Sequence, residues 1–160
     1  MPVAEPPAPQ SLVFELPDEA ATAAVAARFA PLLRTGDLLC LEGDLGAGKT
    51  AFARALINAR PGPREEVPSP TFTLVQTYPR DDLEIWHFDL YRLERPDEVW
   101  ELGLEEALAS GASLVEWPER AGGLLPAERL VLHFEQSGSG RRLTAKAQGN
   151  WAARLKDMKA

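Results

Sequence analysis

A glycine-rich segment constrains this chain more than any other feature. The segment reads GDLGAGKT over residues 43–50, follows a short apolar run and precedes a stretch with helical periodicity. Gly43, Gly48, Lys49 and Thr50 match the G-x-x-x-x-G-K-S/T pattern of a phosphate-binding loop. Such a loop joins the end of a buried strand to the start of a helix, so the pattern predicts an α/β sheet with the loop at its carboxyl edge.

The chemistry of this loop follows from its backbone. Glycines allow successive N–H groups to point at one anion, and the positive end of the following helix adds to that field. The Lys49 ammonium would contact the β- and γ-phosphates of a nucleotide, and the Thr50 hydroxyl would ligate Mg²⁺. We therefore predict a nucleotide phosphate site formed by Asp44, Leu45, Gly46, Ala47, Gly48, Lys49 and Thr50.

Strands alternate with helices along the rest of the chain. Apolar or alternating runs predict strands at 11–15, 38–43, 71–78, 83–91 and 112–117, and helical patterns occupy 21–33, 50–59 and, broken near Gly103, 95–110. The alternation at 129–148 surrounds a glycine-serine turn and predicts an antiparallel hairpin. The predicted class is α/β, with a three-layer sheet like that of P-loop NTPases, parallel at the centre, with antiparallel additions and a C-terminal hairpin.

The length and composition predict one domain. A chain of 160 residues with 45% hydrophobic and 26% charged residues falls in the globular range, and it has no run of the ~20 apolar residues that cross a membrane. We expect residues 1–10 to be a disordered leader, 11–149 the phosphate-loop domain and 150–160 a basic C-terminal tail. The single cysteine, Cys40, falls in the predicted central strand, which favours an inert buried thiol and a cytoplasmic location.

Charge is distributed unevenly. The formal net charge is -7, yet residues 1–136 carry 11 basic and 23 acidic side chains, whereas residues 137–160 carry six basic and one acidic. An acidic body repels the phosphate backbone of nucleic acids. Any contact with nucleic acid is therefore expected to be indirect or to use the basic tail.

Two carboxylates are candidates for metal binding or catalysis beside the loop. Asp89 ends the run EIWHFD and Glu116 ends the run SLVE, so each would emerge near the loop, where nucleotide hydrolysis needs a group that holds the metal and one that orients the attacking water. Either could instead be a solvated acid at a strand end. Thr71, in SPTFT, could belong to a switch segment that responds to the γ-phosphate, although this triplet alone is more typical of a strand start.

Other residue patterns exclude or leave open further classes. His87 alternates with aromatic residues and is predicted to be a packed or surface histidine rather than a ligand, and no cysteine or histidine cluster indicates zinc. The N-K-x-D and D-x-x-G segments of guanine-specific GTPases do not occur at usable positions. A free-standing small-molecule kinase remains an alternative, because Arg92, Arg95 and Arg120 could belong to an arginine-bearing lid.

Four segments in order, GDLGAGKT, SPTFTLV, HFDLYRL and LVEWPER, closely resemble the TsaE (YjeE) family of bacterial P-loop ATPases over about residues 12–134. The resemblance implies a cytoplasmic ATPase that works with the TsaB and TsaD proteins to make threonylcarbamoyladenosine in tRNA, while TsaD transfers the threonylcarbamoyl group. We expect the isolated chain to hydrolyse ATP weakly and its partners to stimulate it. The segment 18–22 matches a family segment close to the adenine.

The same resemblance implies roles for single residues. Lys49 matches the phosphate lysine, and Thr50 matches the magnesium threonine. Thr71 matches the switch threonine, Asp89 the essential acid of H-x-D-L-Y-R, and Glu116 the metal-associated acid of V-E-W. The implied cofactors are ATP and Mg²⁺, with Asp89, Thr71 and Lys49 catalytic and Thr50 and Glu116 at the metal.

Overall fold

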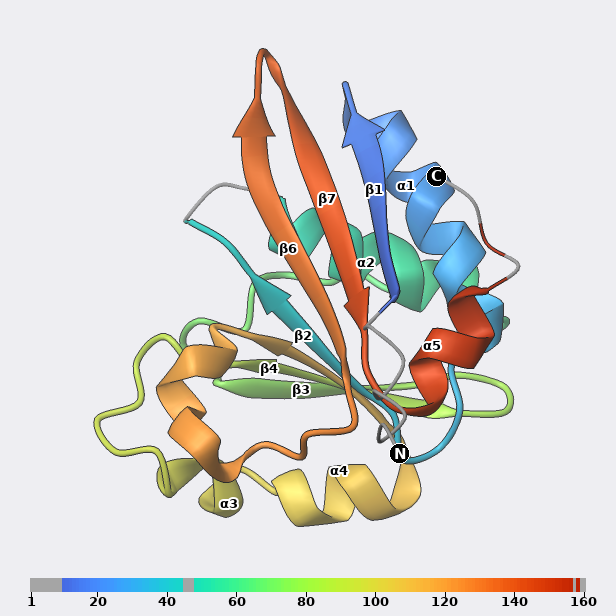
Figure 1. Ribbon diagram of the computed structural model, residues 1–160. Helices are drawn as coiled ribbons and strands as arrows, with labels where there is room; N and C mark the ends of the chain where they lie inside the picture. The colour runs from blue at the N-terminus through green and yellow to red at the C-terminus, as the bar shows by residue number, and fades with distance from the viewer. Residues whose placement is uncertain (1–9, 45–47, 157, 159–160) are drawn as a thin grey trace, which may run out of the picture.

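The computed structural model describes residues 10–44, 48–156 and 158, which form one mixed sheet with helices on both faces (Figure 1). The strands are β1 Gln10–Leu16, β2 Leu38–Glu42, β3 Val75–Pro79, β4 Glu84–Asp89, β5 Ala112–Glu116, β6 Leu130–Ser137 and β7 Gly140–Ala147. The helices are α1 Glu19–Phe29, α2 Lys49–Ala59, α3 Glu98–Glu101, α4 Leu104–Ser110 and α5 Asn150–Leu155, with short 3₁₀ segments η1 Ala30–Leu32 and η2 Pro118–Leu124.

The seven strands lie in the order β1-β7-β6-β2-β5-β4-β3. The four central strands, β6, β2, β5 and β4, run parallel. At the two sides, β7 and β3 pair antiparallel with β6 and β4, and the edge strand β1 pairs antiparallel with β7. This confirms the predicted class, including the C-terminal hairpin of β6 and β7. Parallel pairing also brings the carboxyl ends of β2, β4 and β5 to one edge of the sheet, where ligands bind in folds of this kind.

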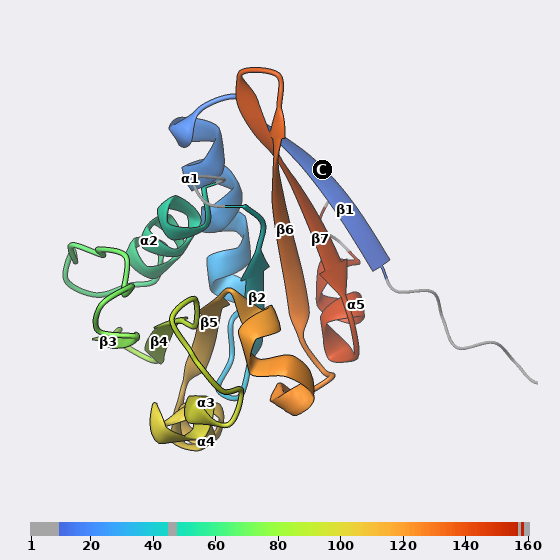
Figure 2. The same cartoon turned by 90° about the vertical axis from the view of Figure 1, so that its left-hand side faces the viewer.

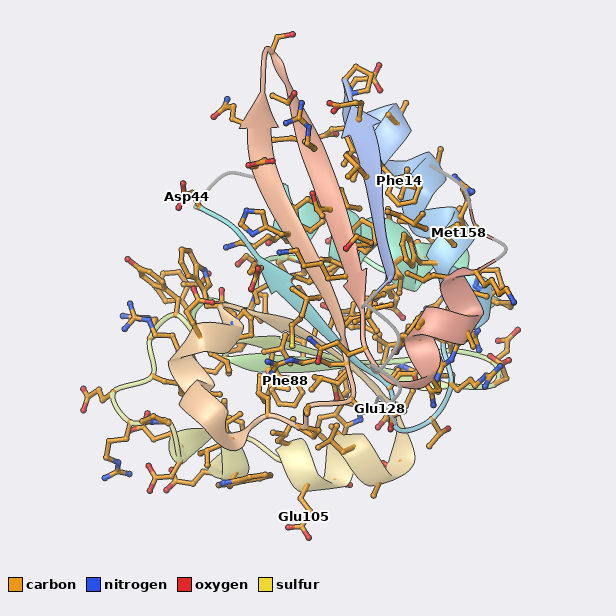
Figure 3. All side chains as sticks on the ribbon, in the orientation of Figure 1. Phe14, Asp44, Phe88, Glu105, Glu128 and Met158 are labelled. Carbon is orange, nitrogen blue, oxygen red and sulfur yellow. The ribbon has the colours of Figure 1, made fainter. Side chains whose placement is uncertain are left out.

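Apolar side chains pack on both faces of the sheet. On one face α1, α2 and α5 cover a cluster that includes Phe14, Phe29 and Phe52, whose rings meet edge to face at centroid distances of 5.9 and 6.0 Å. On the other face α3, α4 and η2 cover a cluster that includes Trp86 and Phe88 (Figures 2 and 3). The central part of the sheet is therefore the middle of three layers, with apolar side chains packed on both of its faces.

Local sequence signals set several element boundaries. Asp18 caps α1, because its carboxylate accepts a hydrogen bond from the Ala21 N–H at 2.8 Å. Gly103, with φ of 95°, separates α3 from α4 as the sequence predicted. Cys40 is buried in β2, also as predicted. No described helix combines the length and apolarity needed to cross a lipid bilayer.

The strand predicted at 71–78 is shorter than expected. It begins only at Val75, because Leu74 has a φ of 68° and its N–H donates to the Pro70 carbonyl at 2.6 Å, which closes a turn. Thr71 consequently lies in this turn rather than in a strand. A turn can present its side chains to a site that a sheet residue would not reach.

The segment predicted as a basic tail begins with a packed helix. Trp151 and Leu155, one helical turn apart in α5, are buried against the face that α1 covers. Arg154 pairs with Asp37 through two hydrogen bonds of 2.6 and 2.8 Å. Residues 1–9 of the predicted leader lie outside the described residues.

Candidate active site

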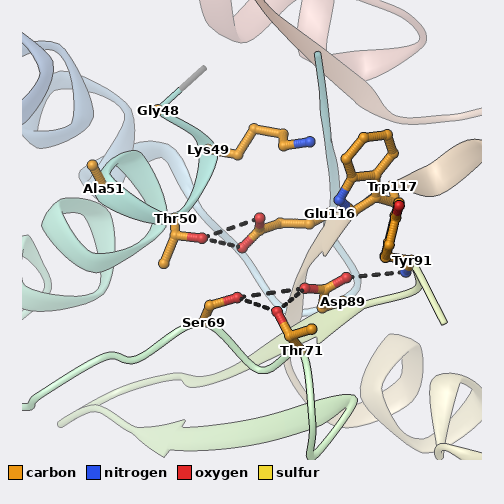
Figure 4. A pocket seen from close by; sticks show the side chains of 10 residues that line it. All are labelled: Gly48, Lys49, Thr50, Ala51, Ser69, Thr71, Asp89, Tyr91, Glu116 and Trp117. Carbon is orange, nitrogen blue, oxygen red and sulfur yellow. Dashed lines mark hydrogen bonds between the residues drawn. The ribbon is translucent and has the colours of Figure 1, made fainter. Parts of the chain in front are cut away.

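A cavity of about 450 Å³ lies at the carboxyl edge of the central strands (Figure 4). It opens between the start of α2, the turn before β3 and the ends of β4 and β5. Its lining residues are Gly48, Lys49, Thr50, Ala51, Ser69, Thr71, Asp89, Tyr91, Glu116 and Trp117.

Two glycines of the loop cannot be replaced without rearrangement. Gly43 has a φ of 134°, and a Cβ there would collide with the backbone oxygen of Phe134 in β6. Gly48 has a φ of 105° and is the N-cap residue immediately before α2. Both conformations are costly for any residue with a side chain, which gives the physical reason for glycine at these two positions of the pattern.

Lys49 is nearly buried and extends toward Trp117 (Figure 4). Its Nζ donates to the Gly43 carbonyl at 2.6 Å and lies 3.6 Å from the centroid of the Trp117 ring. Burial lowers the pKa of the ammonium, and the carboxylates around the cavity, Glu116 foremost, oppose that shift. Within the described part of the chain Lys49 forms no ion pair, so its charge is available to an anion in the cavity.

Three side chains form a buried polar chain on the α2 side of the cavity. The Thr50 hydroxyl donates to both carboxylate oxygens of Glu116, at 3.1 and 3.0 Å. The Oε2 atom of Glu116 also lies 2.7 Å from Nε2 of His87. His87 and Glu116 are only 0% and 3% exposed. Neither side chain is therefore solvated, although the sequence had left a surface His87 and a solvated Glu116 open.

A second polar group surrounds Asp89. The Thr71 hydroxyl donates to Asp89 Oδ2 at 3.0 Å, and the Tyr91 N–H donates to Oδ1 at 3.0 Å. Ser69 Oγ lies 2.7 Å from Thr71 Oγ1 and 3.5 Å from Asp89 Oδ2, so a second hydroxyl lies beside the same carboxylate oxygen. Asp89 is 3% exposed and therefore reaches bulk water only through the cavity.

The two carboxylates lie side by side in the sheet, since Asp89 of β4 is in register with Glu116 of β5. Hydroxyl and carboxylate oxygens are the ligands that Mg²⁺ prefers, and Thr50 with Glu116 supplies both within 3.1 Å. Among the described residues no group of three or more His, Cys, Asp or Glu side chains could hold a metal alone. A cation at this place would complete its shell with phosphate and water oxygens, which suits Mg²⁺.

The cavity brings together the five residues predicted to be catalytic or to hold the metal: Lys49, Thr50, Thr71, Asp89 and Glu116. Of the remaining loop residues, Gly48 lines the cavity, whereas Asp44 is exposed and is not among its lining residues. Leu45, Gly46 and Ala47 lie outside the described residues.

Sequence reasoning missed His87, Ser69, Tyr91 and Trp117 as members of this site. A signal for His87 was present, because residues two apart in a strand face the same side, and His87 precedes Asp89 by two. The histidine was predicted to be packed or on the surface; it is packed, but with a specific carboxylate partner. The other three reach the cavity from segments outside helices and strands, where no periodicity indicates which way a side chain points.

A second cavity of about 260 Å³ adjoins the first, since Gly48 and Ala51 line both. It lies between the start of α1 and the tip of the β6-β7 hairpin, and its lining residues include Asp18, Thr22 and Arg141. The segment 18–22 thus borders the space next to the loop.

The family model and the relatives found by comparison with known proteins agree on one family. The family model described as threonylcarbamoyl adenosine biosynthesis protein TsaE matches residues 16–144. The tRNA threonylcarbamoyladenosine biosynthesis protein TsaE of Rickettsia bellii is 41% identical over 128 residues, which cover 80% of this chain and 89% of that protein. Proteins of the same name from Bacillus subtilis and Haemophilus influenzae are 41% and 33% identical, over 81% and 88% of this chain and 81% and 92% of their own.

The fold agrees with these sequence matches. The crystal structure of Bacillus subtilis YdiB superposes on this chain with a TM-score of 0.78 and 34% sequence identity. The superposition covers 92% of each chain. The similarity therefore extends over nearly the whole molecule rather than over the phosphate loop alone.

Proposed function

The chain belongs to the TsaE family of tRNA threonylcarbamoyladenosine biosynthesis proteins, and from this premise we propose that it binds ATP with Mg²⁺ and hydrolyses it for that modification, in assembly with TsaB-like and TsaD-like proteins. One observation carries the proposal. Lys49, the Thr50–Glu116 pair and the Thr71–Asp89 pair line a single cavity that starts at the N-terminus of α2. A cation, a metal-binding pair and an acid in reach of one phosphate position are what triphosphate hydrolysis requires.

Phosphate binding would use the backbone and Lys49. The N-terminus of α2, eleven residues long, presents unpaired N–H groups and the positive end of the helix dipole to the cavity. The Lys49 amine would exchange the Gly43 carbonyl for phosphate oxygens, which are stronger acceptors because they are charged. With the phosphates beside Gly48, the adjoining cavity at Asp18 and Thr22 offers room for the nucleoside.

Thr50 and Glu116 would hold the metal side of the nucleotide, Thr50 through its hydroxyl and Glu116 directly or through water. When bound, Mg²⁺ would draw charge from the phosphate oxygens and make the terminal phosphorus easier to attack. The direct Thr50–Glu116 hydrogen bond must open to admit a cation. Both side chains already lie at the cavity wall, so this needs only a short displacement.

Asp89 would orient the attacking water. Its two oxygens are held by different donors, Thr71 and the Tyr91 N–H, so the direction of its remaining lone pairs is fixed. A carboxylate fixed in this way can accept a proton from water and align it with the phosphorus. Thr71, in the turn before β3, would couple this acid to the position of the terminal phosphate.

Measurement of ATP binding and turnover by the purified chain tests the proposal. We expect Mg²⁺-dependent ATP binding in the wild type and no detectable turnover in Lys49→Ala, because the principal cation facing the phosphates is lost. Lys156→Ala, at an exposed position after α5, serves as the matched control and should keep wild-type turnover. Wild-type turnover in Lys49→Ala would overturn the assignment of the loop.

The partner assignment rests on the family and on what the cavity lacks. None of the described residues that line it is an arginine, so the transition-state charge would be met by Lys49, the helix terminus and the metal. A site of this kind binds nucleotide better than it hydrolyses it. TsaB-like and TsaD-like proteins would complete it, while the acidic body makes direct tRNA binding outside residues 137–160 unfavourable.

A further inference from the structure

His87 is a buried polar residue that contacts the Glu116 carboxylate. The ring lies in the middle of β4, between Gln76 of β3 and Leu114 of β5 in register, and is 0% exposed. Side chains alternate along this strand: Ile85 packs in the cluster under α1 and α2, whereas Trp86 and Phe88 pack in the opposite one. His87 therefore shares the α2 face of the sheet with Asp89 two residues later.

The ring has one polar contact within the described residues. Nε2 lies 2.7 Å from Glu116 Oε2, while Nδ1 is buried without a hydrogen-bond partner. Because a carboxylate only accepts, Nε2 carries the hydrogen and donates it to Glu116. A fully apolar residue would spare the protein an unpaired buried nitrogen, so packing alone does not account for histidine here.

The contact restrains a carboxylate that would otherwise be free to turn. Thr50 Oγ1 is nearly equidistant from the two Glu116 oxygens, at 3.1 and 3.0 Å, so it does not by itself select one rotation of the carboxylate. His87 binds Oε2 alone and breaks this symmetry. With Oε2 held by the ring, Oε1 is the oxygen left for a further ligand beside the Thr50 hydroxyl.

We propose that His87 is a positioning residue that holds Glu116 in the orientation needed to bind the magnesium-nucleotide complex. The inference rests on the proposed function, because it concerns the same carboxylate. It goes beyond that function because it makes the affinity for Mg²⁺ depend on His87, which would contact neither the metal nor the nucleotide. Donors that orient a ligating group from behind commonly change metal affinity by about 10- to 100-fold when removed.

The test measures how binding of a fluorescent ATP analogue depends on Mg²⁺ concentration. In His87→Leu we expect the half-maximal Mg²⁺ concentration to rise about 10-fold or more, while binding of the analogue in excess chelator stays at the wild-type value. His87→Gln should restore much of the loss, because its side-chain amide can donate to the same carboxylate. In a Glu116→Ala background, His87→Leu should add no further loss, since the oriented group is absent.

His133→Leu is the matched control. His133 also lies 3.2 Å from a carboxylate, Glu42, on the other side of β2, but its side chain is 39% exposed and lies outside the cavity lining. The same substitution there should leave the Mg²⁺ dependence unchanged. Thermal unfolding of the nucleotide-free variants checks their folding, and His87→Asn, whose shorter amide falls short of Glu116, replaces His87→Leu if that variant does not fold.

Different results would overturn the proposed function and the inference about His87. Wild-type protein that binds the analogue without any Mg²⁺ dependence overturns the proposed function, and the inference with it. Wild-type protein with clear Mg²⁺ dependence that His87→Leu leaves unchanged overturns the inference alone. A loss that His87→Gln does not relieve, or that persists undiminished in the Glu116→Ala background, also overturns it, because the effect would then not pass through Glu116.

Discussion

Under the proposed function, substitution of a single residue should separate nucleotide binding from hydrolysis. Asp89→Asn keeps the size of the side chain and one accepting oxygen for Thr71 or the Tyr91 N–H, but it removes the charge. We expect nucleotide affinity within about threefold of wild type and turnover lower by about 10²–10⁴-fold, the usual contribution of a general base. Equilibrium binding and steady-state turnover on the same preparation measure the two effects. Loss of binding would instead place Asp89 at the metal.

Cys40 should be chemically inert in the folded chain. Burial raises the pKa of its thiol from an ordinary value near 9.0 to about 12, and the nucleophilic form of cysteine is the thiolate. At pH 8 we expect iodoacetamide to leave the native protein unmodified over hours and to alkylate it completely in denaturant. Mass spectrometry of both samples measures the fraction of Cys40 that is alkylated. Rapid modification of the native protein would show that β2 is more accessible than the structure indicates.

The same thiol makes stability depend on alkaline pH. Because the folded state keeps a proton that the unfolded state releases above its pKa, the folded state loses relative stability as pH rises through about 9 toward 12. Relative to Cys40→Ala, the wild-type free energy of unfolding should fall by up to about 1.4 kcal/mol per pH unit in that window. Urea unfolding of both proteins at pH 8 and pH 10 compares them, and parallel curves would contradict the assigned shift.

At the level of elements, α5 is tied to the turn before β2 by a nearly buried ion pair. Arg154 and Asp37 have side chains only 7% and 6% exposed, and Arg154 also donates to the Leu32 carbonyl at 3.0 Å. Removing Arg154 leaves the Asp37 carboxylate poorly solvated and without its cationic partner, with the Arg34 N–H still donating to it at 2.6 Å. We expect Arg154→Ala to lower the free energy of unfolding by about 3 kcal/mol, as measured by chemical denaturation.

Lys156→Ala provides the comparison for this substitution, since Lys156 follows the same helix and is exposed. Its effect should stay within about 0.5 kcal/mol of zero. Equal and small effects of the two substitutions would show that α5 adds little to the fold. The pairing also means that Arg154 cannot contribute fully to a positive surface for tRNA, so such a surface would depend on the exposed cations of residues 137–160.

At the scale of the whole molecule, the proposed function predicts that a partner completes the site. Its cavity is open, has no arginine among its described lining residues, and lies on a body with far more acidic than basic side chains. We expect slow turnover by the pure chain and a rate about 10³–10⁵-fold higher if a partner supplies an arginine to the transition state. Turnover alone and in a verified complex with TsaB-like and TsaD-like proteins from the same source measures this, and equal rates would remove partner activation.

Local patterns determined much of this protein. The buried run of β2, the start of α2 after Gly48, the break at Gly103 and the β6-β7 hairpin all depend on residues close together in the chain, and each was predictable for that reason. Asp89 and Glu116 could also be placed near the loop, because the carboxyl ends of parallel strands share one edge of a sheet.

Only the tertiary structure decided the contacts that join distant segments. The crossover through α3 and α4 sets β4 beside β5 and so brings His87 within 2.7 Å of Glu116, and the backbone after β5 turns Trp117 over Lys49. The turn that carries Thr71 replaced a predicted strand because Leu74 adopts a left-handed conformation. Such contacts depend on the relative placement of whole elements, which packing of the two cores fixes and which no local periodicity encodes.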